Sequence, residues 1–320
     1  MKETTRLTCK ETAEWLRERD DFLILTHRRP DGDTLGSAAG LCSGLREIGK
    51  RAYLLENPET TERYLEYVAP YAASADFVPR FVISVDTADA GILQNNATPY
   101  LERVDLCIDH HGSCTGYAAF TCLEAEKASC GEVVYDVLMA LSGKVSAESA
   151  LPLYVALATD TGCFVYANVT ADTLCVAGEL LRAGADHVTV NKKLFRTKSR
   201  GRIALDGALF SSLAFYCGGQ VAVCVVTQAL LTECGVTEDD LDDIATIPNQ
   251  VEGVRIGIVV KELPVGGCRV SVRTVPGVNA NVICQKFGGG GHSMAAGCTV
   301  DASPSEAARR LVEAAEAELR

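Results

Sequence analysis

The sequence predicts an α/β protein with two domains: an N-terminal domain built on a parallel sheet with helices on both faces, and a smaller C-terminal α+β domain. In the first half, short and almost continuously apolar strands alternate with helical patterns, which is typical of a parallel sheet buried on both faces. In the second half, neighbouring strands are joined by short turns that contain glycine, which is typical of hairpins. A basic segment with few strand or helix signals separates the two patterns.

The elements of the first domain follow from the positions of its apolar runs. We expect strands at 22–26, 52–55, 81–85 and 104–108, and helices at 35–49, 130–141 and 147–158. In the first of these helices, Gly36, Gly40 and Gly44 are spaced four residues apart and therefore lie on one ridge. We expect this ridge to allow close packing of the helix on the sheet.

The second domain is expected to follow a connecting segment. Basic residues crowd this segment: Lys192, Lys193, Arg196, Lys198, Arg200 and Arg202. We interpret it as a solvated linker at 192–205 between domains at 1–191 and 206–320. The alternative is a basic strip that faces the cleft between the domains. Hairpins are expected at 208–216 with 221–227 and at 255–263 with 268–274, and helices at 241–246, 280–287 and 305–319.

The charge balance limits the classes of partner. The formal net charge is −12, whereas a protein that grips long nucleic acid usually carries a basic face. Small phosphorylated substrates remain compatible, because a carboxylate-rich metal site is itself acidic before its ions are counted. No apolar run approaches the roughly 20 residues that cross a bilayer, so no membrane partner is expected. The polar N-terminus lacks the apolar core of a secretory signal, and we therefore expect a cytoplasmic protein.

The 14 cysteines are scattered, and none forms a C-x-x-C pair. Several lie inside apolar runs, such as Cys107, Cys224 and Cys284. A disulfide scaffold is typically a smaller, secreted chain. We therefore expect reduced thiols that act as small core side chains.

Acidic residues and histidines follow the apolar runs of the first domain. These residues are His27, Asp31 and Asp33 after the run at 22–26, Asp86 after 81–85, Asp109, His110 and His111 after 104–108, and Asp160 after 147–158. Ligands bind at the carboxyl edge of a parallel sheet, so these side chains are expected to converge on one point.

The types of donor suggest a metal site. Oxygen and imidazole ligands without thiolates suit Mn²⁺, Mg²⁺ or Fe²⁺. Two such cations that share a carboxylate would clamp the attacking and leaving oxygens of a displacement at phosphorus. Each residue alone is more often a helix cap, a turn residue or a surface residue than a ligand. The combination favours metal binding, because three of the five histidines of the chain lie in these groups.

A second pattern lies in the C-terminal domain. Four consecutive glycines at 288–291 precede His292. Glycines let backbone N–H groups approach an anion closely, and the histidine would add a further donor. Arg273, on the strand expected before them, is a candidate phosphate ligand. A flexible loop and a surface arginine are the alternatives that composition alone favours.

Taken in order, these motifs resemble those of the DHH phosphoesterases. The matching segments are His27-x-x-Pro30-Asp31-Gly32-Asp33, Asp86-Thr87, Asp109-His110-His111 and Asp160-Thr161-Gly162. The glycine motif followed by Ala295-Ala296-Gly297 resembles the signature of the associated DHHA1 domain. The resemblance spans residues 22–297, and in length and order it is most similar to the bacterial nano-RNase and pAp-phosphatase type. It implies a metal-binding DHH domain, a substrate-binding DHHA1 domain and a cleft between them.

The resemblance also implies a role for each residue. One divalent cation would be held by His27, Asp31 and Asp86, and a second by Asp33, Asp86, His110 and Asp160, with Asp86 bridging. His111 would be catalytic, as a general acid or charge stabiliser, with Asp109 orienting a neighbouring histidine. The terminal phosphate of the substrate would be bound by Arg273, Gly289, Gly290, Gly291 and His292. Two Mn²⁺ ions are expected, with Mg²⁺ or Fe²⁺ as alternatives.

The activity implied by the resemblance is hydrolysis of very short oligonucleotides, such as pApA, to nucleoside 5′-monophosphates, or of pAp to AMP and phosphate. Long nucleic acid is not expected as a substrate. The alternatives are a pyrophosphatase or exopolyphosphatase with the same metal domain, and a non-catalytic nucleotide sensor. The glycine motif argues against a pyrophosphatase, and the intact set of candidate ligands argues against a sensor. The oligomeric state is open, with a homodimer as one alternative.

Two features depart from the pattern of the family that the chain resembles. Val165 follows Phe164 where many relatives carry an arginine. Arg28 and Arg29 make the first loop more basic than the commoner neutral version.

Overall fold

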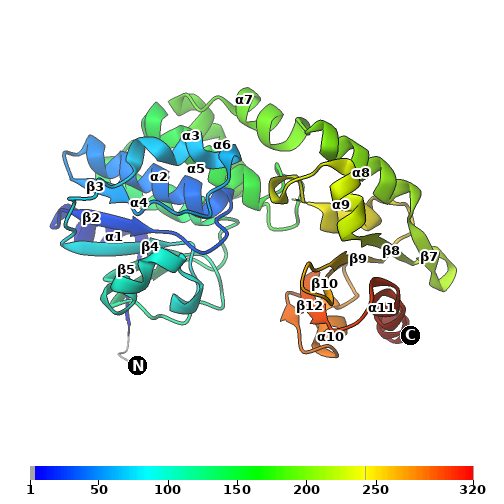
Figure 1. The fold of residues 1–320 in the computed structure, drawn as a ribbon. Coiled ribbons are helices and arrows are strands. Elements are labelled where there is room, and N and C mark those ends of the chain that lie inside the picture. The colour runs from blue at the N-terminus through cyan, green and yellow to red at the C-terminus, as the bar shows by residue number, and fades with distance from the viewer. Residues whose placement is uncertain (1–3, 242, 320) are drawn as a thin grey trace. The chain divides into compact units, whose positions relative to one another are not determined.

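The computed structural model describes residues 4–241 and 243–319. The chain forms two compact units, Met1–Thr197 and Lys198–Arg320, and the division between them falls inside the segment at 192–205. Figure 1 labels most of the α-helices and strands of both units. Residues 1–3 of the polar N-terminus and residue 242 of the helix expected at 241–246 lie outside the described residues.

The first unit contains a six-stranded sheet with the order β1-β6-β5-β4-β2-β3, in which every neighbouring pair is parallel. Its strands are β1 (Thr5–Arg6), β2 (Phe22–Leu25), β3 (Ala52–Leu54), β4 (Phe81–Val85), β5 (Leu106–Asp109) and β6 (Phe120–Leu123). Its α-helices are α1 (Cys9–Arg17), α2 (Gly32–Glu47), α3 (Glu62–Val68), α4 (Cys130–Ser142), α5 (Ala147–Asp160), α6 (Ala171–Ala183) and α7 (His187–Asn191). Its 3₁₀ helices are η1 (Ala69–Tyr71), η2 (Ala90–Ile92) and η3 (Asn95–Arg103), and η4 (Lys192–Arg196) is a π-helix. The predicted parallel sheet is confirmed.

Both faces of this sheet are buried. Successive residues of a strand point to opposite sides, so each strand contributes to a core on either face. Phe22 and Ile24 of β2 share one core with residues of α2, α4 and α5, and Figure 1 shows α2 and α5 on that side of the strands. Leu23 and Leu25 of the same strand share another core with Ala97 of η3. Helices therefore cover both faces, as predicted, with 3₁₀ turns on the second face.

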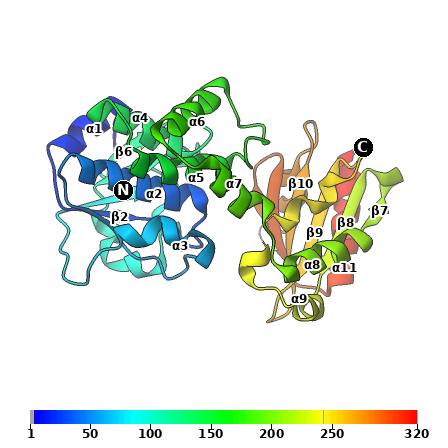
Figure 2. The same cartoon turned by 90° about the horizontal axis from the view of Figure 1, so that it is seen from above.

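The second unit contains a mixed sheet with the order β11-β12-β10-β9-β8-β7, and Figure 2 shows β10, β9, β8 and β7 side by side. Its strands are β7 (Ala214–Tyr216), β8 (Val221–Val226), β9 (Ile256–Glu262), β10 (Cys268–Thr274), β11 (Gly290–Gly291) and β12 (Ala295–Val300). Its helices are α8 (Arg200–Ser211), α9 (Gln228–Cys234), α10 (Ala280–Gln285) and α11 (Pro304–Leu319), with η5 (Cys217–Gly219), η6 (Glu238–Leu241) and η7 (Ile244–Gln250). The pairs β7–β8 and β9–β10 are antiparallel, which confirms the two expected hairpins.

Helix α8 corrects the expectation of weak structure in the basic segment, and the first hairpin strand begins at Ala214 rather than at residue 208. Ser199 caps this helix by accepting a hydrogen bond from the Arg202 N–H. The Arg202 guanidinium lies 2.7 Å from the Asp206 carboxylate one turn later. Basic side chains are compatible with a helix here because a cap and an ion pair support it.

The glycine ridge of α2 packs against helices and not against the sheet, so that expectation was wrong. A Cβ atom at Gly36 would lie 2.3 Å from the Pro152 carbonyl oxygen in α5. One at Gly44 would lie 2.5 Å from the Leu138 side chain in α4. The ridge therefore brings the backbones of α2 and α5 close together, and these are two of the helices that carry candidate site residues.

The cysteines follow the sequence-based expectation. All 14 lie in the part of the chain that the structure describes, and each is a free thiol. Eight of them are buried, among them Cys107, Cys224 and Cys284. Among the described residues, no helix combines the length and the apolar character that a membrane span requires.

Candidate active site

The candidate site residues of the first unit gather at the carboxyl edge of the parallel sheet. β2 leads into His27, β4 leads into Asp86, and β5 ends at Asp109 before His110 and His111. In the sheet, β2 lies between β3 and β4. The chain therefore passes from β2 to its neighbour on one side, β3, and then from β3 to the neighbour of β2 on the other side, β4. Such a reversal of strand order is where ligands bind in open α/β sheets.

Two helix ends complete the set. Asp31 is the N-cap of α2, where its side chain accepts hydrogen bonds from the N–H groups of Asp33 and Thr34. Asp33 lies in the first turn of that helix. Asp160 is the last residue of α5.

His27, Asp31 and Asp86 form what we call the first cluster. The Nε2 atom of His27 lies 3.6 Å from a carboxylate oxygen of Asp31 and 3.6 Å from one of Asp86. One ligand atom from each residue lies within 4.8 Å of the other two. A single cation could bind all three side chains at this spacing.

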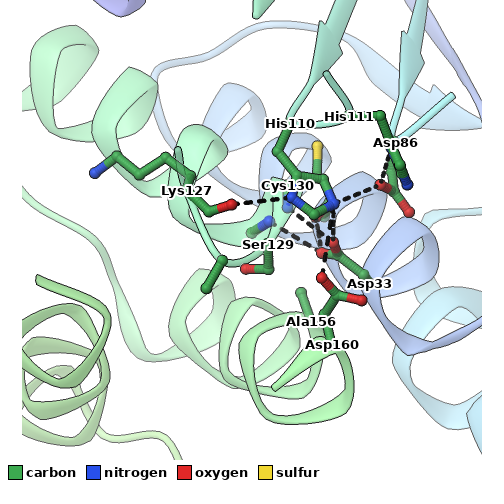
Figure 3. A network of polar contacts seen from close by, with 12 residues as sticks. Asp33, Asp86, His110, His111, Lys127, Ser129, Cys130, Ala156 and Asp160 are labelled. Carbon is green, nitrogen blue, oxygen red and sulfur yellow. Dashed lines mark hydrogen bonds and ion pairs between the residues drawn. The ribbon is translucent and has the colours of Figure 1, made fainter. Parts of the chain in front are cut away.

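Asp33, His110 and Asp160 form the second cluster, which Figure 3 shows from close by. The Nε2 atom of His110 lies 3.6 Å from a carboxylate oxygen of Asp33 and 3.6 Å from one of Asp160. It also lies 3.5 Å from Oδ1 of Asp86, whose Oδ2 faces His27. The Asp86 carboxylate is therefore shared by the two clusters.

Backbone carbonyl groups fix both histidine rings. The Nδ1 atom of His27 lies 2.7 Å from the Arg28 carbonyl oxygen, and that of His110 lies 3.1 Å from the Lys127 carbonyl oxygen (Figure 3). A carbonyl oxygen accepts and never donates, so Nδ1 carries the proton in both rings. Nε2 of each ring then faces the carboxylates, and when it gives up its proton its lone pair is free for a cation, as in metal-binding histidines.

The buried carboxylates are held by different contacts. Asp33 accepts hydrogen bonds of 2.8–3.0 Å from the Ser37 hydroxyl and from the N–H groups of Cys130 and Gly131 at the start of α4. Asp86 has a φ of +53°, which is uncommon for a residue other than glycine. Its buried Oδ1 atom has no hydrogen-bond partner among the described residues. Burying such an oxygen without a partner is costly, so this atom fits a metal ligand.

The crowding of carboxylates shifts the pKa values of the site. Burial raises the pKa of Asp33 well above its ordinary value and that of Asp160 to about 6, and the Asp86 charge acts in the same direction. Burial alone would lower the pKa of the histidines, but the neighbouring carboxylates raise the pKa of His27 to about 11 and that of His110 to about 10. The site thus retains protons to balance its negative charge, and divalent cations can take their place.

His111 lies beside the clusters and has a carboxylate partner of its own. Its Nδ1 atom lies 2.8 Å from Oδ1 of Asp109, which also accepts the N–H groups of His110 and His111. This hydrogen bond raises the pKa of His111. Asp109 is fully buried, whereas the His111 side chain is 37% exposed. The buried acid therefore orients a ring that a ligand can reach from solvent.

The glycine motif of the second unit is built into its sheet. Gly290 and Gly291 of β11 pair with Gly297 and Ala296 of β12. On the other side of β12, Arg273 of β10 pairs with Ala295. The structure therefore places Arg273 and the glycine motif on either side of one strand.

The neighbouring residues of this motif are also in ordered contacts. The N–H groups of Gly288 and Gly289 donate to carbonyl oxygens of α10, which ends that helix. A Cβ atom at Gly289 would lie 2.3 Å from the Gly297 carbonyl oxygen, so close packing requires glycine there. The N–H of the exposed His292 donates to the Ala295 carbonyl oxygen at 2.8 Å. In this conformation the N–H groups of Gly288 and Gly289 serve the fold rather than a bound anion.

The donors that hold Asp33 were not anticipated from the sequence. A signal for the start of α4 existed, because Ser129 precedes Glu132 by three residues and its hydroxyl accepts the Glu132 N–H. A helix N-terminus attracts a carboxylate. The sequence contains no pattern that pairs this particular helix with Asp33.

Fold and site together define a metal-dependent phosphoesterase, with carboxylate and histidine ligands gathered at one edge of a parallel sheet. Residues 21–159 match the DHH family, N-terminal domain, and residues 218–320 match the DHHA1 domain. The chain therefore belongs to the DHH family and carries a DHHA1 domain, which confirms the resemblance noted in the sequence.

Individual relatives agree with this assignment. The chain is 33% identical to the bifunctional oligoribonuclease and PAP phosphatase NrnA of Thermus thermophilus, over 92% of this chain and 89% of the relative. It is 26% identical to the protein of the same name from Bacillus subtilis, over 88% and 90%. An exopolyphosphatase-related protein from Bacteroides fragilis shares the fold, with a TM-score of 0.87, 22% identity and coverage of 97% and 95%.

Proposed function

We propose that the protein hydrolyses phosphate esters in very short oligonucleotides such as pApA, giving nucleoside 5′-monophosphates, and hydrolyses pAp to AMP and phosphate. The observation that carries this proposal is the position of Asp86, whose two carboxylate oxygens face His27 and His110 at 3.6 and 3.5 Å. A buried carboxylate between two histidines suits a pair of cations at a phosphoryl centre. The names of the two NrnA relatives support the same substrates.

The proposed metal ligands divide between the two clusters. His27, Asp31 and Asp86 would hold one divalent cation, and Asp33, Asp86, His110 and Asp160 would hold the other. We propose Mn²⁺, with Mg²⁺ or Fe²⁺ as alternatives, since the donors are oxygen and imidazole. When bound, two cations neutralise phosphate charge and lower the pKa of water.

His111 is proposed as the catalytic residue of the protein itself. Because its Nδ1–H is held by Asp109, the other ring nitrogen is the one directed to a substrate. From there it can donate a hydrogen bond to a phosphate oxygen or a proton to the leaving oxygen. Asp109 acts through this ring and is therefore a positioning residue.

Substrate binding is proposed for the second unit. Arg273, Gly289, Gly290, Gly291 and His292 would bind the terminal phosphate. This assignment is supported by the family resemblance and by the register of the sheet, in which Arg273 pairs with Ala295 and Gly291 pairs with Ala296. The N–H of Gly289 would have to leave its helix-ending bond to contribute.

Product analysis tests the proposal. The purified protein is incubated with pApA, pAp and RNAs of two to ten nucleotides, and with a 20-mer, in Mn²⁺ or Mg²⁺. We expect AMP from pApA and from pAp, no degradation of the 20-mer, and loss of all turnover in EDTA. Inorganic pyrophosphate is the comparison substrate. Hydrolysis of pyrophosphate without release of AMP from pApA would refute the proposal.

A further inference from the structure

A pocket of about 500 Å³ lies beside the first cluster, within the first unit. Its lining residues are His27, Arg28, Arg29, Glu59, Ile92 and Asn95. His27 belongs to the pocket and to the first cluster, so the pocket adjoins the candidate metal site. Pockets of about 300–1,000 Å³ are typical binding sites for small ligands.

Two arginines give this pocket its charge. Arg28 and Arg29 are both exposed, and no carboxylate in the part of the chain that the structure describes lies within ion-pair distance of either guanidinium. The chain as a whole has a net charge of −12, but in the pocket lining two arginines face a single carboxylate, Glu59, which leaves a local excess of positive charge. Guanidinium groups of this kind bind phosphate with several directed hydrogen bonds.

The backbone that carries the arginines is fixed by specific contacts. Arg29 has a φ of +50°, and its N–H donates to Glu59 at 3.0 Å. The Asn95 amide donates to the other oxygen of Glu59 at 2.6 Å, and the Arg28 N–H donates to the Ile92 carbonyl oxygen at 2.8 Å. The Glu59 carboxylate is thus engaged in holding the pocket wall. Backbone strain that is held in place by surrounding contacts is common at functional sites.

We propose that this pocket is a nucleotide subsite in which Arg28 and Arg29 bind a substrate phosphate other than the one that is hydrolysed. The inference rests on the proposed function, in which the second unit binds the terminal phosphate. The substrate pApA has a terminal and a scissile phosphate and leaves no further phosphate for the pocket. The trinucleotide pApApA has one more, on the far side of the scissile bond. The pocket therefore favours substrates slightly longer than a dinucleotide.

The test compares the two substrate lengths in a double variant, Arg28→Gln with Arg29→Gln. We expect the ratio of KM for pApApA to KM for pApA to rise about tenfold, because a hydrogen bond to a charged phosphate is worth roughly the 1.4 kcal/mol that a tenfold change represents. A change in KM rather than kcat is expected, because the contact is the same before and during the reaction. The matched control is Arg80→Gln with Arg103→Gln. These residues are exposed and precede β4 and β5, at the opposite edge of the sheet.

A binding measurement separates this inference from the proposed function. Calorimetric titration of pApApA into metal-free protein, in EDTA, is expected to give a Kd about tenfold higher for the Arg28/Arg29 variant than for the control. An unchanged KM ratio and Kd would overturn the subsite, and so would an equal loss on pApA. If the wild-type protein hydrolyses neither substrate, the proposed function fails, and the calorimetry alone decides whether the pocket binds the oligonucleotide.

Discussion

The two clusters that meet at Asp86 differ in how firmly the protein holds their side chains. In the second cluster, Asp33 is 1% exposed and accepts three hydrogen bonds from α2 and α4. In the first cluster, the Asp31 side chain is 59% exposed and accepts hydrogen bonds from the start of its own helix. Ligands that are already fixed lose less conformational freedom when a cation binds. We therefore expect the second cluster to bind its cation more tightly.

The difference also separates two tasks. The second cluster is anchored by the start of α4 and the end of α5, whereas the first cluster adjoins the pocket of Arg28 and Arg29. We therefore expect the cation of the second cluster to be mainly structural and that of the first cluster to contact the substrate, with Asp86 as their shared ligand.

The largest expected effect comes from Asp86→Asn, which removes the carboxylate that joins the clusters. Turnover of pApA in saturating Mn²⁺ is expected to fall by about three orders of magnitude, since metal stabilisation of a phosphoryl transition state is worth several kcal/mol. Asparagine tolerates a positive φ, so thermal unfolding should still be cooperative. The control is Asp76→Asn, an exposed acid outside the site. Retained turnover in the Asp86 variant would contradict its role as a shared ligand.

Asp33→Asn and Asp31→Asn test the comparison directly. We expect Asp33→Asn to remove the tighter of two Mn²⁺-binding steps and Asp31→Asn to weaken the looser one. The kcat/KM of the Asp33 variant should be about tenfold lower than that of the Asp31 variant, a difference of roughly 1.4 kcal/mol. Asparagine at position 31 preserves the helix cap. Free Mn²⁺ is followed by electron paramagnetic resonance during a titration. Equal loss of the same step in both variants would show that the clusters do not differ.

The smallest effect on turnover is expected from Gly36→Ala in α2, which acts on stability. The added methyl group meets the Pro152 carbonyl oxygen, and such overpacking typically costs about 1–3 kcal/mol in the free energy of unfolding. Because α2 carries Asp31 and Asp33, both Mn²⁺-binding steps should weaken together. The matched control is Gly207→Ala in α8, where the methyl group meets no atom within 4 Å, and a gain of up to about 1 kcal/mol is expected. Urea unfolding measures the free energy of unfolding of both variants. An unchanged value for the Gly36 variant would contradict the close packing of α2 on α5.

Some elements of the fold could be predicted from the sequence because their signal is local. The runs at 22–26 and 81–85 are apolar throughout, as fully buried parallel strands require, and they form β2 and β4. β1 was missed because Thr5 and Arg6 are exposed and carry no apolar signal. β6 was missed because its four residues include Thr121 and follow β5 without an intervening helix.

The site was accessible to sequence reasoning where side chains follow strands, because sheet geometry brings strand ends together. The structure does place the six candidate metal ligands in two adjoining groups, and their binding of metal stays a prediction. The carbonyl groups of Arg28 and Lys127 that fix the histidine rings could not be predicted, because every residue has a carbonyl group. Glu59 and Asn95 were missed because tertiary contact alone brings them to the pocket.

The order of the candidate ligands along the chain governs when the enzyme can start to work. His27, Asp31 and Asp33 are translated early, but Asp160 ends the fifth α-helix, after the whole parallel sheet has been made. Since the N-terminal part of a protein leaves the ribosome first, an unfinished chain carries one set of ligands without its counterpart. If these residues bind the cations as proposed, a growing polypeptide has no complete metal site until the end of α5 has been translated.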